Sequence, residues 1–271
     1  EILSSKLGTR SRNRHAADLT CGYEFESLTL TGSLGTEKYD VYPGFETLRS
    51  ASATYRISEE ISLKAWLGRG IRYPNFTELY YSDPYTVGNA GLDPELCDDY
   101  GAGADFNTGT VNARVSAIFR NAFGLIDWGK ESPSDTYWQA KNIGLVSTAG
   151  LNADVSAALG PVKVSAAYSV YDYIISRQYL PKYGASYLKN RLSASLDADV
   201  LGFSCRITYA FRNYINRQDY CSETGISVSR KVLDNLEVTI RADDVFDRRY
   251  EDSPGIPAPG RMVSLRLEGS L

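Results

Sequence analysis

The sequence contains no long apolar run. No stretch of the 271 residues approaches the ~18 consecutive apolar residues that a membrane-spanning helix needs, which excludes a helical membrane protein. Histidine and methionine are each present once, as His15 and Met262. Because histidine is so scarce, a His-rich metal site is excluded, and we predict no metal site.

Cysteine and catalytic motifs are also sparse. The four cysteines form no CxxC pair, and we expect none of them to face another in the strand register. There is no GxSxG motif, no Gly-rich phosphate loop and no nucleophile–base pair within one loop. A Ser-His-Asp arrangement would have to use His15. We therefore predict that the protein is not an enzyme, and we predict no catalytic residue, no cofactor and no nucleic-acid partner.

What the sequence does contain is alternation of apolar and polar residues. Val111, Ala113 and Val115 share one face of a predicted strand, while Asn112 and Arg114 share the other. Such segments number about thirteen, and no segment has a sustained helical period. They lie near residues 15–25, 28–39, 45–57, 61–70, 96–106, 110–127, 138–159, 162–173, 187–199, 203–212, 220–230, 236–246 and 260–271. The pattern predicts one all-β domain with an antiparallel, up-and-down sheet.

The connections between these segments alternate between short and long. The short ones lie at 26–27, 58–60, 107–109, 160–161, 199–202 and 231–235, and the longer ones at about 72–95, 129–136, 174–186, 213–219 and 247–259. Outer-membrane β-barrels have short periplasmic turns and longer extracellular loops. Many segments reach about 10–12 residues, enough to cross a bilayer when tilted, whereas soluble strands are more often about 5–6 residues. The sequence therefore predicts a transmembrane β-barrel.

Period-2 alternation by itself also fits a β-sandwich, in which two apolar faces meet in a core. The polar faces here carry Lys, Arg, Asp and Glu, which favours a barrel with a wet or plugged interior. The 20 tyrosines against 9 phenylalanines fit rings placed at a water–hydrocarbon boundary. A passive porin- or adhesin-type barrel and a soluble β-sandwich binding module stay open as alternatives.

Three motifs resemble those of the TonB-dependent outer-membrane transporters. Residues 72–80 read RYPNFTELY and residues 88–95 read GNAGLDPE, similar to the family's R-x-P-(S/N)-(F/L)-x-E-L-Y … G-N-P-x-L-x-P-E. Residues 238–251 (VTIRADDVFDRRYE) look like its V-x-N-L-F-D-(K/R)-x-Y-E strand, with Asp244 in place of the usual asparagine. Residues 259–265 (PGRMVSL) look like its final strand. The order and spacing of the three motifs match the family over nearly the whole chain.

The resemblance implies a plugged barrel of roughly 22 strands. Residues 1–271 would then be the C-terminal part of the barrel domain, with the N-terminal plug absent. It also implies an outer-membrane receptor that takes up a scarce, large nutrient complex by active transport. The smaller family members, which carry cobalamin or catecholate-type ferric siderophores, are the most similar. The implied partners are outer-membrane lipid and lipopolysaccharide, the cargo, and the TonB–ExbB–ExbD complex acting through the plug region.

Candidate ligand-binding residues lie in the first long loop. Tyr80, Tyr81, Tyr85 and Asn89 could form a stacking and hydrogen-bonding patch for cargo, since aromatic residues dominate binding hot spots. The alternative is an interfacial girdle or a loop packed on itself. For Trp128 and Trp138, which flank the 129–136 loop, we expect a position in the aromatic girdle where a strand leaves the membrane.

Overall fold

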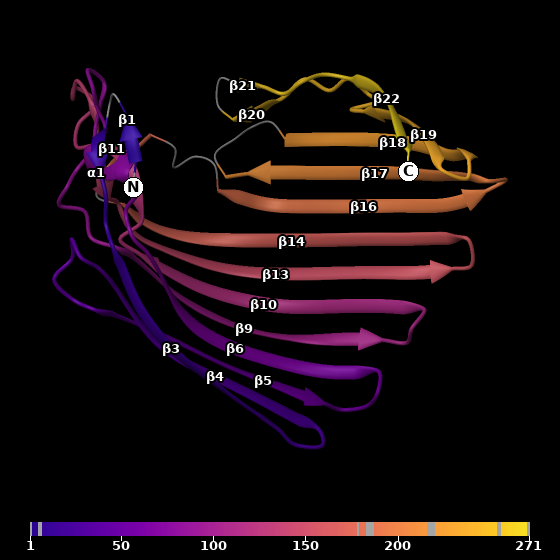
Figure 1. Cartoon of the computed structure of the whole chain (residues 1–271), viewed down its shortest axis with the longest axis horizontal. Helices are drawn as coiled ribbons and strands as arrows, with labels where there is room; N and C mark the ends of the chain where they lie inside the picture. The colour runs from indigo at the N-terminus through magenta and orange to yellow at the C-terminus, as the bar shows by residue number, and fades with distance from the viewer. Residues whose placement is uncertain are drawn as a thin grey trace.

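The fold is dominated by one antiparallel sheet whose strands follow one another in chain order (Figure 1). The computed structural model describes residues 2–4, 7–177, 179–182, 187–215, 220–253 and 256–269. Its 13 strands are β3 (Arg14–Glu24), β4 (Leu28–Tyr39), β5 (Glu46–Arg56), β6 (Ile61–Arg72), β9 (Glu95–Asn107), β10 (Val111–Phe123), β13 (Gly144–Leu159), β14 (Val162–Arg177), β16 (Leu188–Val200), β17 (Phe203–Tyr214), β18 (Tyr220–Leu233), β19 (Leu236–Asp243) and β22 (Met262–Gly269). The predicted all-β, antiparallel, up-and-down order is confirmed, with β3 and β22 at the two edges of the sheet.

The sheet has one apolar and one charged face. Leu63, Leu67 and Val115 share the apolar face, and their side chains are exposed. On the charged face, Asp105 pairs with both Lys64 and Arg114. Among the described residues no second sheet covers the apolar face, so a soluble β-sandwich does not fit, because so large an exposed apolar surface needs lipid or a partner.

The connections sort by length as predicted. Joining strands at one end of the sheet are residues 25–27, 57–60, 108–110, 160–161, 201–202 and 234–235. At the other end are residues 40–45, 73–94, 124–143, 178–187, 215–219 and 244–261. Of the latter, residues 178, 183–186, 216–219 and 254–255 lie outside the described ranges. We call these two ends the short-turn end and the long-loop end.

A pair of glycines bends the hairpin formed by β10 and β13. Gly124 (φ 62°) and Gly144 (φ 114°) have left-handed backbone angles that residues with a side chain rarely adopt. Beyond them the antiparallel pairing resumes in the same register, with Ile126 opposite Asn142. The resumed strands are β11 (Ile126–Lys130) and β12 (Trp138–Asn142). The sequence predicted unbroken strands over 110–127 and 138–159, whereas the structure splits each at its glycine and carries the outer half into a separate sheet.

One short helix, α1 (Phe76–Tyr80), interrupts the first long loop, in a part of the sequence that shows no sustained helical period. Asn75 caps it: the Asn75 Oδ1 accepts from the Glu78 N–H at 2.9 Å, and the Glu78 carboxylate accepts from the Asn75 N–H at 2.8 Å. This reciprocal capping box explains why so short a segment is helical. Among the described residues, no helix is both long and apolar enough to cross a membrane.

The two C-terminal motifs pair along β19 and β22, and a side-chain contact also joins them. Asp244 and Asp247 have φ values of 47° and 52°, in the left-handed region that aspartate tolerates better than most residues. The turn that they form places the Asp247 carboxylate where it accepts from the Arg261 N–H at 2.9 Å. The contact therefore joins the turn after β19 to the start of β22.

Asp244→Asn is expected to stabilise the protein. The Asp244 side chain is buried, and neither of its carboxylate oxygens has a hydrogen-bond partner among the described residues. An amide removes the buried charge and can donate, so the free energy of unfolding should rise by about 1–3 kcal/mol. Denaturant unfolding in detergent micelles measures this. Asp234→Asn, the same change at an exposed turn, should change stability by less than about 0.5 kcal/mol; an equal gain there, or a loss for Asp244→Asn, would contradict the account.

Candidate ligand-binding head

A small second sheet sits at the long-loop end, at the left of Figure 1. Its order is β15–β11–β12–β8–β7, with β7 (Ser82–Asp83), β8 (Thr86–Val87) and β15 (Leu180–Pro181) added to β11 and β12. We call these five strands together with α1 the head. The head combines the first long loop, the bent hairpin of β10 and β13 and part of the loop after β14, so three segments remote in sequence form one unit.

The head has its own apolar core. Leu79, Leu92 and Ala140 are buried at its centre, and Trp128 packs against them. Burial of each leucine contributes about 1.5–3 kcal/mol relative to exposure. Trp128 thus lies in the head core and not in the expected aromatic girdle. Trp138 also lies in the head, on β12, where the Lys130 ammonium is 4.8 Å from the centre of its ring. Because the hairpin bends at Gly124 and Gly144, both tryptophans lie in the head sheet and not in the barrel wall.

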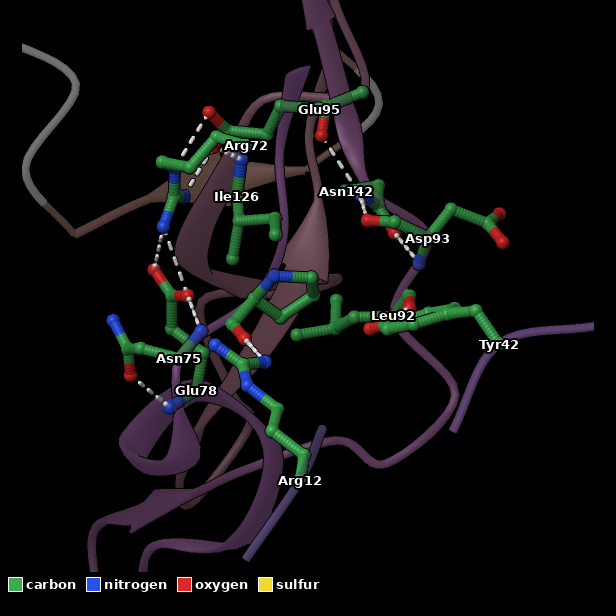
Figure 2. Close-up of polar contacts among 12 residues, drawn as sticks. Arg12, Tyr42, Arg72, Asn75, Glu78, Leu92, Asp93, Glu95, Ile126 and Asn142 are labelled. Carbon is green, nitrogen blue, oxygen red and sulfur yellow. Dashed lines mark hydrogen bonds and ion pairs between the residues drawn. The ribbon is translucent and has the colours of Figure 1, made fainter. Parts of the chain in front are cut away.

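Arg72 ties the head to the wall (Figure 2). Its guanidinium pairs with Glu95 at the start of β9, with Nε 2.7 Å from Oε2. It also donates to both oxygens of Glu78 in α1, each at 3.0 Å. Glu95 Oε1 in turn accepts from the Ile126 N–H at 2.6 Å. One arginine therefore connects the end of β6 with α1, β9 and β11. This network explains the roles of Arg72 and Glu95, the first residue of the 72–80 motif and the last residue of the 88–95 motif.

A second clamp is formed by Asn142 (Figure 2). Its Oδ1 accepts from the Asp93 N–H at 3.0 Å, while its Nδ2 donates to the Asp93 and Gly124 carbonyls at 3.0 and 2.7 Å. Beside it, the Tyr42 hydroxyl donates to the Leu92 carbonyl at 3.2 Å. These bonds supply partners for the Leu92 carbonyl, for both backbone polar groups of Asp93 and for the Gly124 carbonyl.

Tyr73 anchors the start of the same loop. Its buried ring lies edge-on to Tyr39, with centroids 4.7 Å apart, and its hydroxyl donates to the Glu37 carbonyl at 3.1 Å. Burial, followed by the nearby negative charge of Glu37, raises the pKa of Tyr73 to about 12. The hydroxyl therefore stays neutral and serves as a fixed donor.

Three of the predicted ligand-binding residues take part in the head's own structure. The Tyr80 ring is half-buried against the head core and faces the Arg10 guanidinium at 4.2 Å. The Tyr81 hydroxyl donates to Asp83 at 2.8 Å. The Asn89 Oδ1 accepts from the Gly91 N–H at 2.9 Å in a local turn. Ligand contact by Tyr80, Tyr81 and Asn89 stays a prediction.

Tyr85 is placed differently, since its side chain is 72% exposed. Its carbonyl accepts from the Trp138 N–H at 2.8 Å, next to the parallel pairing of Trp138 with Thr86. Tyr137, also exposed, directly precedes β12 as Tyr85 directly precedes β8, so the parallel pairing places the two tyrosines next to each other. Sequence reasoning missed Tyr137, because nothing local indicates that β8 and β12 pair.

A polar hollow of about 380 Å³ lies beside Tyr137. Lys141 and Glu131 form an ion pair at 2.6 Å at its edge. Asp135 accepts from the backbone N–H groups of Ser132 and Glu131, at 3.1 and 2.8 Å, and these bonds hold its pKa below the usual range. Both signs of charge therefore face the hollow, together with an aromatic ring and the side chain of Gln139.

The site is suited to binding rather than to bond making. Among residues within the described ranges, no group of three or more His, Cys, Asp or Glu side chains is arranged to hold a metal ion. The four cysteines are all free. The head presents exposed tyrosines and side chains of both charges, and the Arg72 and Asn142 contacts hold it rigidly on the wall.

A one-layer antiparallel sheet with an exposed apolar face, short turns at one end and a structured head at the other defines an outer-membrane β-barrel protein. The family profile described as "TonB dependent receptor-like, beta-barrel" matches residues 13–235. The chain belongs to the TonB-dependent receptor β-barrel family, a family of transport receptors rather than enzymes, and is an outer-membrane protein.

Relatives agree with this placement. The vitamin B12 transporter BtuB of Photobacterium profundum is 25% identical over 261 residues, which cover 91% of this chain and 42% of that protein. The siderophore receptor PirA of Pseudomonas aeruginosa has a similar structure, with TM-score 0.77 and 19% identity over 95% of this chain and 46% of that one. The copper transporter OprC has TM-score 0.77 and 16% identity, covering 96% and 48%. The chain spans about half the length of these relatives, and the structural matches show a shared fold.

Proposed function

We propose that the chain forms the wall and extracellular head of a receptor that captures a large nutrient complex, a ferric siderophore or cobalamin, for TonB-energised uptake. The head carries this proposal, because a loop that only closed a passive pore would not need its own core and an arginine tether. The names of relatives that carry vitamin B12, siderophores or copper support transport as the class of activity.

Within this proposal the charged face of the sheet is the barrel interior. The lumen would hold an N-terminal plug, and the TonB–ExbB–ExbD complex would act on that plug. Ion pairs such as that of Arg114 with Asp105, 2.5 Å long, line this face. These ion pairs make the inner wall around the plug polar. A plug needs polar surroundings of this kind if it is to move or rearrange during transport.

The cargo surface is proposed to centre on Tyr85 and Tyr137. Tyr85→Ala combined with Tyr137→Ala is expected to weaken cargo binding about tenfold or more, because paired exposed aromatics supply contact area at low entropic cost. The measurement is equilibrium binding of cyanocobalamin and of a ferric catecholate siderophore to the complete receptor in outer-membrane vesicles. Changing both tyrosines to phenylalanine should keep most of the affinity. Unchanged binding in the double alanine variant would remove these residues from the cargo surface.

Uptake measurements separate this function from a passive barrel. Uptake by the energised receptor should saturate at low cargo concentration and stop when TonB is deleted or the proton gradient is collapsed. A porin-like barrel would show uptake that rises linearly with concentration and is indifferent to TonB. The latter result would remove the transport proposal while leaving the fold assignment intact.

A further inference from the structure

The segment that leads into β3 lies across α1. We call residues 7–13, which end directly before β3, the strap. The strap reaches both ends of α1 with arginine side chains. The guanidinium carbon of Arg12 lies 5.1 Å from the centre of the Phe76 ring, and that of Arg10 lies 4.2 Å from the centre of the Tyr80 ring. Phe76 and Tyr80 are the first and last residues of the helix, so the strap covers its aromatic side.

Arg12 and the end of the strap are firmly held. The Arg12 guanidinium donates to the Pro74 carbonyl at 2.5 Å (Figure 2), and its carbon lies 4.2 Å from the centre of the Tyr39 ring. One residue further on, the backbone N–H and the side-chain amide of Asn13 both donate to the Asp40 carboxylate at 3.1 Å. Several contacts would have to break together before this part of the strap could leave α1.

Arg10 is held by much less. Its side chain is exposed, and its Nε donates to the carbonyl of Leu7 within the strap itself at 3.1 Å. Across the strap its one recorded contact within the described ranges is the cation–π contact with Tyr80. A cation over a ring at an exposed position adds little stability. Rotation of the Arg10 side chain alone therefore uncovers the ring, with no change in the backbone of the strap.

The ring of Tyr80 has three kinds of neighbour. It packs against the buried core of the head, and the Phe76 ring lies alongside it, with centroids 6.3 Å apart and planes inclined by 27°. Arg10 covers it from the strap. Of these neighbours, only Arg10 can move away without disturbing packed side chains. Access to the Tyr80 ring is therefore controlled by the position of the Arg10 guanidinium.

We propose that Arg10 is a gate over Tyr80. Cargo that contacts this ring must first displace the Arg10 guanidinium, while Arg12 keeps the strap and α1 in place. The proposal rests on the proposed function, because Tyr80 is one of its predicted cargo residues. The two arginines then have opposite effects although they are two residues apart. Arg10 competes with the cargo, and Arg12 supports the surface that the cargo uses.

The first test is equilibrium binding of cyanocobalamin and of a ferric catecholate siderophore to the complete receptor in outer-membrane vesicles. Arg10→Ala should lower the Kd of the probe that binds about threefold, because an exposed cation–π contact no longer has to be broken. Arg10→Lys keeps a cation over the ring and should leave the Kd near that of the wild type. In a Tyr80→Ala background, Arg10→Ala should change nothing, because the gate then covers no ring.

Arg230→Ala is the matched control for these measurements. The Arg230 guanidinium carbon lies 4.7 Å from the centre of the Phe203 ring, so the variant removes the same kind of contact at the short-turn end, away from the head. It should leave the Kd of both probes unchanged.

Hydroxyl-radical footprinting of the complete receptor, read by mass spectrometry, measures the gate without cargo. In Arg10→Ala the modification of the Tyr80 ring should rise about threefold, in step with the loss of the same contact. Tyr85 serves as the internal reference, because its side chain is already 72% exposed and should be modified equally in both proteins.

The role of Arg12 has a separate readout. Arg12→Ala should lower the hydrogen-exchange protection of the Tyr81 amide, which donates to the Thr77 carbonyl at 3.0 Å, about tenfold. Arg10→Ala should leave this protection as it is. Equal loss of protection in the two variants would make both arginines simple braces of α1 and would overturn the division of roles.

Other results would also overturn the gate. Weaker binding of the probe in Arg10→Ala would make Arg10 a cargo contact. An equal effect of Arg10→Ala with and without the Tyr80 ring would show that the arginine acts elsewhere, and an unchanged footprint of Tyr80 would show that it covers nothing. If neither probe binds the complete receptor, the cargo assignment of the proposed function fails, and the footprint alone decides whether Arg10 covers Tyr80.

Discussion

Gly88→Ala is expected to detach the 88–95 segment from α1. A methyl group at Gly88 would lie 2.7 Å from the Tyr80 nitrogen and 2.8 Å from the Leu79 carbonyl carbon, both backbone atoms that cannot rotate away. The bonds from the Gly88 N–H to the Tyr81 carbonyl (2.6 Å) and from the Asn89 N–H to the Glu78 carbonyl (2.8 Å) would be lost with the shift. Overpacking against backbone costs about 3 kcal/mol at such a site.

Amide hydrogen exchange measures this effect without knowledge of the cargo. Protection at the Asn89 and Leu92 amides should fall about a hundredfold, as 3 kcal/mol implies, while the β9 and β10 amides keep theirs. Gly70→Ala is the matched control, since a methyl group there meets no atom within 4 Å. Equal loss of protection in both variants, or none in Gly88→Ala, would show that the close approach to α1 does not hold the loop.

Arg72→Ala is expected to loosen the whole head. It leaves Glu78 and Glu95, whose side chains are 14% and 13% exposed, facing each other without a cation. Removing one partner of a buried pair costs about 3–5 kcal/mol, and the 44% exposure of the Arg72 side chain reduces this to about 2 kcal/mol here. The expected result is a roughly thirtyfold loss of protection at the Ile126 amide.

A second substitution separates charge from shape. Combining Arg72→Ala with Glu95→Gln removes one of the two repelling charges but keeps an oxygen that accepts from Ile126, so part of the protection should return. Arg241→Ala is the control, because Arg241 pairs with Asp243 two residues away on the same strand and is largely exposed. Its loss should cost less than about 1 kcal/mol. A cost equal to that of Arg72→Ala would mean that the head network has no special role.

The wall of the barrel could be predicted from the sequence because each strand carries its own signal. Alternation places Val111, Ala113 and Val115 on one face whatever their neighbours do, and tight turns such as 160–161 fix the hairpin register locally. The expected 13 strands and the sorting of short and long connections are both confirmed. Boundaries differed by a few residues, except where Gly124 and Gly144 split two strands.

The head could not be predicted in the same way, because its contacts join segments far apart in sequence. The parallel pairing of Trp138 with Thr86 has no local signature, so Tyr137 was missed and Trp128 was expected in the membrane boundary. The motif at residues 72–80 was recognised as a resemblance, but its role in tethering is visible only once Ile126 lies beside Glu95. Among the four predicted ligand-binding residues, Tyr85 is distinguished by its high exposure, and this exposure is visible only in the structure.

The bend separates the outer half of the β10–β13 hairpin, residues 125–143, from the wall of the barrel. Pairing in the wall reaches Phe123 opposite Leu145, and the Gly124 N–H still donates to the Gly144 carbonyl at 3.0 Å. Everything between these glycines leaves and re-enters the wall at adjacent points. Insertions or deletions there can therefore change the surface of the head without shifting the register of any wall strand. Sequence changes within 125–143 would therefore alter the exposed surface of the head while every strand of the wall keeps its partners and its register.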